Sequence, residues 1–138
     1  MVLLDLTDPE TPAGPLYTTE FFESCKAVLK PGGAVVLHIG APFYEPAQIS
    51  SMLSKLGHVF EQVSPFGLHI PLYGAYWGLV VVSDSLAPKT VAADVIEQRL
   101  LDRDIADLQY YNSEIHGALF ALPNYYKNLV PELLTTEV

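Results

Sequence analysis

Residues 3–9 read LLDLTDP, an apolar run that ends in two carboxylates. The run predicts a strand over Val2 to Leu6 that is buried on both faces, as in the centre of an α/β sheet. Pro9 ends it, because proline has no N–H for ladder pairing. Since chemistry in an open α/β sheet collects at the carboxyl ends of the strands, we expect Asp5 and Asp8 to lie in a site that faces a cationic substrate.

Length, charge and cysteine content narrow the class of protein. The 138 residues are 50% hydrophobic, which suffices for one compact core. Sixteen acidic against seven basic residues give a net charge of −9, which disfavours nucleic acid and suits a polyvalent cation as partner. The single cysteine, Cys25, excludes an internal disulfide and fits the reducing cytoplasm, where we expect the protein. We expect no membrane span and no signal peptide, because no apolar run is long enough and the N-terminus lacks a positive segment.

The first forty residues predict a strand, a helix and a second strand. Residues 8–16 carry three prolines and are expected to lack regular structure. A helix follows from about Thr18 to Lys30, capped by Thr18 or Thr19, and Ala34 to Ile39 forms the second strand. This order gives a right-handed βαβ unit, so the two strands are parallel and their ends with Asp5 and His38 point the same way. The apolar stripe of the helix is expected to comprise Phe21, Cys25, Val28 and Leu29.

The remaining segments predict a second helix, an antiparallel strand pair and a helical C-terminus. The segment from Pro65 to Trp77 is too short for a crossover helix, so the strands on either side of it pair antiparallel. The second helix runs from Glu45 or Pro46 to Leu56, before Gly57, with Ile49, Met52, Leu53 and Leu56 facing inward. Strands are expected at residues 59–64 and 78–83, and a surface loop at 85–89. One or two helices are expected at 92–108, and two more short ones at 112–122 and 123–133.

Together these elements amount to half of a doubly wound α/β sheet: two parallel strands plus a terminal antiparallel pair, with flanking helices. No predicted strand is followed by a glycine-rich turn, so the chain has no phosphate- or nucleoside-binding motif of its own. The strand at Val2 to Leu6 has the composition of a central strand. We therefore expect the chain to begin in the middle of a domain.

The residues alone leave two interpretations of Asp5 and Asp8 open. Aspartates in turns often accept hydrogen bonds from nearby backbone N–H groups and have only a structural role. Alternatively, a pair of carboxylates at a strand end binds an ammonium group, with one as the base that takes its proton and the other as the anchor.

Other side chains near this strand end also allow two interpretations. His38 is either a core histidine or a residue that lines the same cleft as Asp5. Tyr73, Tyr76 and Trp77 are either packing residues or the walls of a slot for an aliphatic diamine. The histidines show no metal-ligand spacing, so we expect no metal site, and Cys25 is expected to be an inert core thiol.

A series of motifs extends along the chain in a fixed order. They are residues 5–9, DLTDP; Pro12-Ala13 with Leu16-Tyr17-Thr18 and Glu20-Phe21-Phe22; Pro31-Gly32-Gly33 before a strand; Ile70-Pro71-Leu72-Tyr73; and residues 110–123, YYNSEIHGALFALP. This series resembles the C-terminal half of the spermidine synthases, the polyamine aminopropyltransferases. The last motif is the most specific, being long and unusual, and the resemblance covers essentially the whole chain.

The resemblance implies that residues 1–138 are the C-terminal part of a Rossmann-like, methyltransferase-type catalytic domain. The implied reaction moves an aminopropyl group from the co-substrate decarboxylated S-adenosylmethionine to putrescine, giving spermidine and methylthioadenosine, with no tightly bound cofactor. A homo-oligomer is also implied, because the family forms dimers. The implied site comprises Asp5 as proton acceptor, Asp8, Tyr73 and His38 at the diamine, and Pro12, Ala13 and Leu16 near the nucleoside.

This sequence departs from the family pattern in places. Thr11 replaces the glycine usual before Pro12, and His38 stands where many members have glutamine. The segment after Tyr73 is one residue shorter. The family's glycine-rich nucleoside motif and its N-terminal β-domain are expected upstream of Met1, so we expect the 138-residue chain alone to be inactive.

Two other functions stay open at this point. One is a non-catalytic remnant that serves as a binding or oligomerisation module, and the other is a divergent S-adenosylmethionine-dependent methyltransferase-like protein. The methyltransferase is disfavoured, because the motifs at residues 5–9 and 70–73 together match a diamine site.

Overall fold

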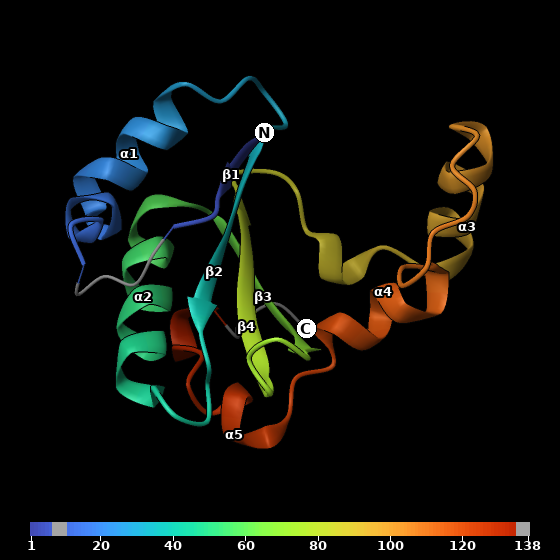
Figure 1. Ribbon diagram of the computed structural model, residues 1–138. Helices are drawn as coiled ribbons and strands as arrows, with labels where there is room; N and C mark the ends of the chain where they lie inside the picture. The colour runs from blue at the N-terminus through green and yellow to red at the C-terminus, as the bar shows by residue number, and fades with distance from the viewer. Residues whose placement is uncertain (7–10, 135–138) are drawn as a thin grey trace.

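The computed structural model of the protein describes residues 1–6 and 11–134. These residues form a four-stranded sheet in the order β1-β2-β4-β3, with helices against both of its faces and a helical arm to one side (Figure 1). The strands are β1 (Val2–Leu4), β2 (Ala34–Gly40), β3 (Gln62–Ile70) and β4 (Ala75–Ser83). The helices are α1 (Thr19–Ala27), α2 (Pro46–Val59), α3 (Ala93–Asp102), α4 (Ser113–Phe120) and α5 (Asn124–Lys127), with the 3-10 helices η1 (Gly14–Tyr17), η2 (Pro88–Thr90) and η3 (Glu132–Leu134).

The strand pairing confirms the predicted fold class. β1 and β2 are parallel, and β3 and β4 form the terminal antiparallel pair, with β4 between β2 and β3. Because β1 and β2 run the same way, their carboxyl ends lie at one edge of the sheet. This edge is where the predicted site residues were expected to meet.

The core lies between α1, α2 and one face of the sheet, here called the inner face, which carries Val35, Leu37, Val80 and Val82. The four predicted inward residues of α2 are all buried, and so is Cys25 on α1. Burial raises the pKa of the Cys25 thiol, as expected for an inert core cysteine.

The start of the chain differs from the prediction in three ways. β1 is short and its Leu3 is 65% exposed, because β1 is the edge strand of the described sheet. The described part of the proline-rich segment contains η1, since Pro15 fits the first turn of a short helix, where its missing N–H is not needed. α1 ends at Ala27, so Val28 lies beyond it and is 73% exposed, whereas the fully buried Phe22 was missed. Thr18 is the cap, as predicted, and its Oγ1 accepts the Phe21 N–H at 3.2 Å.

The prediction that Gly57 ends α2 is wrong. The helix continues to Val59, whose side chain is buried. A Cβ on Gly57 would lie 2.9 Å from Cδ2 of Leu134, so glycine lets the C-terminal segment approach the helix. Burial of apolar side chains here outweighs the cost of about 1 kcal/mol for glycine inside a helix.

The predicted bounds of the antiparallel pair are also wrong, because β3 and β4 extend through most of the segment from Pro65 to Trp77 and are joined by a turn at residues 71–74. Pro65 is tolerated since β3 is an edge strand. Gly67 makes room for the ring of Tyr76, which would lie 2.5 Å from a Cβ at that position. The two residue types that suggested a loop are therefore accommodated within a strand.

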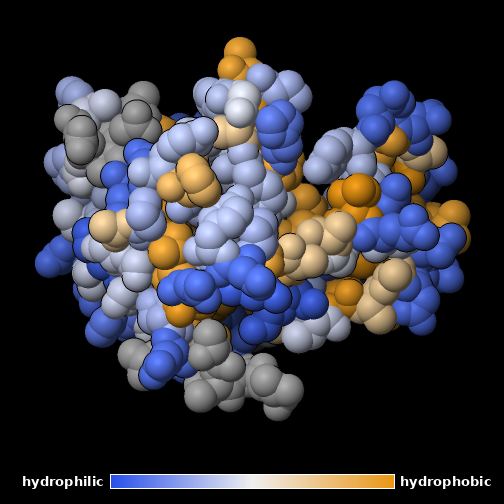
Figure 2. Space-filling model, turned by 90° about the horizontal axis from the view of Figure 1, so that it is seen from below, coloured by the Kyte–Doolittle hydropathy of each residue, from blue (hydrophilic) through white to orange (hydrophobic). Residues whose placement is uncertain are grey.

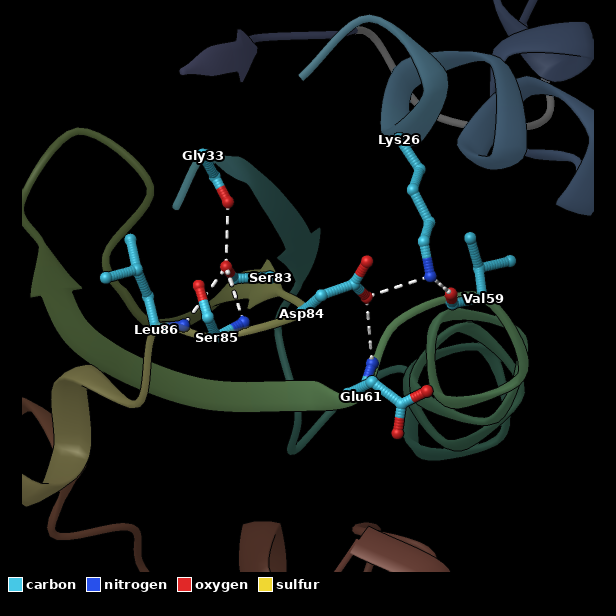
Figure 3. A network of polar contacts seen from close by, with 8 residues as sticks. All are labelled: Lys26, Gly33, Val59, Glu61, Ser83, Asp84, Ser85 and Leu86. Atoms are coloured by element: carbon cyan, nitrogen blue, oxygen red, sulfur yellow. Dashed lines mark hydrogen bonds and ion pairs between the residues drawn. The ribbon is translucent and has the colours of Figure 1, made fainter. Parts of the chain in front are cut away.

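Polar contacts close the end of the sheet that is opposite the carboxyl ends of β1 and β2 (Figure 3). Ser83 Oγ donates to the Gly33 carbonyl at 2.7 Å and accepts the N–H groups of Ser85 and Leu86 at 3.2 and 3.1 Å. Lys26 Nζ lies 2.8 Å from an Asp84 carboxylate oxygen. The hydrogen bond from Lys26 lowers the pKa of the Asp84 carboxyl. These contacts hold β2, β4 and α1 together at this end.

The other face of the sheet, the outer face, carries Val36, His38, Leu79 and Phe66 and is only partly covered. α4 packs against its β3 side, where the rings of Phe120 and Phe66 are 5.4 Å apart. α3 stands away from the sheet as an arm (Figure 1), and Figure 2 shows apolar patches on this arm, at the right, beside polar ones. No helix among the described residues is long and apolar enough to span a bilayer.

Candidate active site

A cleft of about 710 Å³ opens on the outer face at the carboxyl ends of β1 and β2. The two residues after β1, one residue of β2 and several residues of the β3–β4 hairpin line it. The lining residues are Asp5, Leu6, His38, Ile70, Tyr73, Trp77 and Leu79.

The strand register explains why Asp5 and His38 are neighbours. Leu4 pairs with Leu37, so the next residues of the two parallel strands, Asp5 and His38, lie side by side and point to the same face. On the other side, His38 pairs with Leu79 of β4. The structure thus supports the interpretation of His38 as a residue that lines the cleft, and not that of a core histidine.

A β-bulge at the end of β2 shapes the floor of the cleft. The ladder to β4 shifts between His38 and Gly40, and Gly40 has a φ of +100°, which favours glycine. The Glu45 carboxylate accepts the Ala41 N–H at 3.1 Å directly after the bulge. The chain turns here toward α2, and His38 is the last residue of β2 that lines the cleft.

Aromatic rings line the same cleft as Asp5. The ring centroids of Tyr73 and Trp77 are 4.5 Å apart, and Trp77 lies 6.3 Å from the His38 ring. Tyr73 is 56% exposed, at the mouth of the cleft. A carboxylate facing aromatic and aliphatic side chains suits an alkylammonium ion, whose charge and hydrocarbon chain need different partners.

The structure brings together three of the predicted site residues: Asp5, His38 and Tyr73. Asp8 lies outside the described residues. The predicted nucleoside contacts do not line this cleft, because Pro12 and Ala13 precede η1 and Leu16 belongs to it. Their role stays a prediction.

The interpretation of Tyr76 as a cleft wall is wrong. Its ring lies on the inner face, 6.3 Å from the buried ring of Tyr126, and burial raises the pKa of Tyr76. Side chains alternate along a strand, so Tyr76 and Trp77 cannot both face the cleft. The same alternation could have identified Leu79, an apolar lining residue that the sequence analysis missed, and likewise Ile70 on β3.

No group of three or more histidine, cysteine, aspartate or glutamate side chains in residues 1–6 and 11–134 is placed to hold a metal ion.

Comparison with protein families gives a match to the spermine/spermidine synthase domain over residues 1–94. The polyamine aminopropyltransferase of Nitrosomonas europaea is 40% identical over 131 residues, which cover 95% of this chain and 40% of that protein. Polyamine aminopropyltransferase 2 of Hyperthermus butylicus is 33% identical over 133 residues, 95% of this chain and 44% of that protein.

Solved structures show the same similarity. Spermidine synthase in complex with the transition-state analogue AdoDATO superposes with a TM-score of 0.79 at 27% identity, over 91% of this chain and 42% of that one. The spermidine synthase of Thermotoga maritima gives a TM-score of 0.74 at 26% identity, over 89% and 41% of the two chains. The chain thus spans about two fifths of the length of the relatives it matches.

Proposed function

The chain belongs to the spermine/spermidine synthase family, and on this premise we propose that its cleft is the amine-acceptor part of an aminopropyltransferase active site. The reaction transfers an aminopropyl group from decarboxylated S-adenosylmethionine to a diamine such as putrescine, and gives spermidine and methylthioadenosine. The observation that carries the proposal is that Asp5, Tyr73 and Trp77 line one cleft at the carboxyl ends of two parallel strands.

Asp5 is the proposed base. An alkylammonium has a pKa of about 10.4, like that of lysine, so it is no nucleophile near pH 7 until a proton leaves. The Asp5 carboxylate takes this proton, and the freed nitrogen attacks the aminopropyl carbon that is bonded to the sulfonium. The carbon–sulfur bond breaks, its electron pair passes to sulfur, and the positive charge ends on the new secondary ammonium. Orientation supplies much of the acceleration, since a sulfonium is already a good leaving group.

The other residues of the cleft position the acceptor. Tyr73 and Trp77 hold the hydrocarbon chain of the diamine and offer cation–π contact to its ammonium. The role of Asp8 as the anchor of the second ammonium rests on the family resemblance alone, as do the nucleoside contacts of Pro12, Ala13 and Leu16.

The nucleoside of the co-substrate needs residues that these 138 do not supply, because none of their strands is followed by a glycine-rich turn. We propose that these residues correspond to the part of the relatives that this chain does not span. Exposed apolar side chains on α3 and in the segment after it, among them Leu101 and Tyr110, support a homo-oligomer. The single cysteine supports a cytoplasmic location.

A chimeric enzyme tests the proposal. It joins the preceding part of the Nitrosomonas europaea relative to residues 1–138, and that relative itself serves as the positive control. We expect the chimera to form spermidine and methylthioadenosine in equal amounts from putrescine and decarboxylated S-adenosylmethionine, and the 138-residue chain alone to show no turnover. A chimera with native-like circular dichroism that binds methylthioadenosine but forms no spermidine would contradict the proposal, as would methyl transfer from S-adenosylmethionine.

A further inference from the structure

The motif at residues 110–123 is the most specific part of the family resemblance, yet none of its residues is among those that line the cleft. It begins at the base of the arm, defined here as residues 91–110, and continues through α4 (Figure 1). The histidine of this motif, His116, is 8% exposed, and both of its ring nitrogens make hydrogen bonds. A buried imidazole with two partners joins the segments from which the partners come.

The two partners of His116 lie at opposite ends of the arm. Its Nε2 is 2.8 Å from the carbonyl oxygen of Pro88, in η2 just before the arm. Its Nδ1 is 2.7 Å from the hydroxyl of Tyr111, the residue directly after the arm. A carbonyl oxygen only accepts, so Nε2 carries a hydrogen, whereas a tyrosine hydroxyl can either donate to Nδ1 or accept from it. Both bonds can therefore form whatever the charge of the ring.

α4 connects the His116 ring to the sheet. The imidazole lies 5.3 Å from the ring of Phe120, one turn further along the helix, and 5.9 Å from the ring of Tyr111. Phe120 in turn packs against Phe66 of β3, with 5.4 Å between the ring centroids. The two ends of the arm are thus fastened, through one side chain, to the outer face of the sheet.

The arm has few other attachments. Among the described elements, α3 packs mainly against α4, and Ile96 is the one buried residue of α3. Leu101, near the end of the helix, is 69% exposed. A helix of ten residues is marginal in water on its own, because few of its backbone bonds repay the cost of nucleation. The order of α3 therefore depends on the contacts at the base of the arm.

We propose that His116 is a latch: it fastens both ends of the arm to α4, and the arm is a local folding unit that is ordered only while these bonds are made. When they open, the arm detaches and α3 loses its helix, whereas the sheet and the inner-face core stay folded. The exposed apolar side chains of Leu101 and Tyr110 keep their arrangement only in the latched state. The latch is independent of the proposed function, because no residue of the cleft takes part in it.

Native-state hydrogen exchange of the 138-residue chain, measured amide by amide by NMR, tests the latch. Tyr111→Phe removes one of the two hydrogen bonds and keeps the ring. We expect the α3 amides of this variant to exchange about tenfold faster, and those of β2 and β4 to change by less than about twofold. His116→Ala removes both bonds, so its α3 amides should exchange faster still, close to the rate of an unstructured peptide.

Tyr110→Phe is the matched control. It removes the same hydroxyl from the neighbouring residue, whose side chain is 55% exposed, and should leave the exchange of α3 within about twofold of the native rate. Unchanged α3 exchange in Tyr111→Phe would overturn the latch, and this variant decides the question even where His116→Ala does not fold. Equal acceleration in α3, β2 and β4 would also overturn it, because the arm would then unfold only together with the whole molecule.

Discussion

Two buried serines on neighbouring strands show how partners decide the energetic effect of a hydroxyl group. Ser83 Oγ on β4 makes three hydrogen bonds to backbone groups, from Gly33 to Leu86. Ser64 on β3 is as deeply buried, but its Oγ has no partner among the described residues. A satisfied buried hydroxyl stabilises a fold, whereas an unsatisfied one costs free energy without compensation.

Substitution of the two serines by alanine should therefore change the free energy of unfolding in opposite directions. Ser83→Ala is expected to lower the free energy of unfolding by about 1–3 kcal/mol, because the Gly33 carbonyl and two N–H groups lose their partner. Ser64→Ala is expected to raise it by up to about 1 kcal/mol. Urea unfolding followed by circular dichroism measures both. A loss of stability in Ser64→Ala equal to that in Ser83→Ala would contradict this account.

Tyr126 should make the protein less stable in alkali. Burial, with a smaller effect of Tyr76, raises the pKa of Tyr126, whose ring is fully buried on the inner face. Above a pH of about 10 this tyrosine loses its proton in the unfolded chain but keeps it in the folded one, so the unfolded state binds fewer protons and stability falls as the pH rises.

The variant Tyr126→Phe removes this contribution. Between pH 9 and pH 11 its free energy of unfolding should fall less steeply than that of the native protein. Tyr125→Phe is the control, because the Tyr125 side chain is 39% exposed, and its slope should follow the native one. Equal slopes for all three proteins would show that Tyr126 does not contribute.

At the scale of elements, Gly40 and Gly117 are expected to respond differently to alanine, one because of its backbone geometry and the other because of helix propensity. Gly40 ends β2 with a φ of +100°, and a Cβ there would lie 2.6 Å from Oε2 of Glu45. Gly117 lies inside α4, and a Cβ there meets no atom within 4 Å. Gly40→Ala is expected to cost about 1–3 kcal/mol through strain, and Gly117→Ala to add about 0.5–1 kcal/mol through helix propensity. Thermal unfolding measures the stability of both variants. A Gly40→Ala variant more stable than the native protein would contradict the claim that a side chain at this position strains the bulge.

The elements with regular apolar spacing could be predicted from the sequence. β2 follows from its continuous apolar run, and the inward residues of α2 follow from their helical spacing. The antiparallel pairing of β3 with β4 was also predicted, but the length of the two strands could not be, because Pro65 and Gly67 are typical of loops. β3 tolerates Pro65 because it is an edge strand, and Gly67 because the Tyr76 ring packs over it. Neither feature can be read from the sequence around these two residues.

At the scale of the whole molecule, the two ends of the sheet have different roles. At one end Ser83, Lys26 and Asp84 hold strands and helix together, and at the other end Asp5 and His38 line an open cleft. The position of Asp5 and His38 could be predicted, because the carboxyl ends of parallel strands meet at one edge. The residues alone left Tyr73 open as a packing residue or a cleft wall, since its place in the cleft depends on a hairpin turn at residues 71–74 that the sequence analysis did not locate.

The most direct test of the central claim is the turnover number of Asp5→Asn in the chimeric enzyme at saturating putrescine. Asparagine keeps the size of the side chain but cannot accept the ammonium proton, so we expect kcat to fall by about 10²–10⁴-fold. Asp84→Asn removes a surface carboxylate at the opposite end of the sheet and should leave kcat within about twofold, as expected of an exposed ion pair. An Asp5→Asn enzyme that turns over as fast as the native chimera would contradict the claim that this cleft supplies the base.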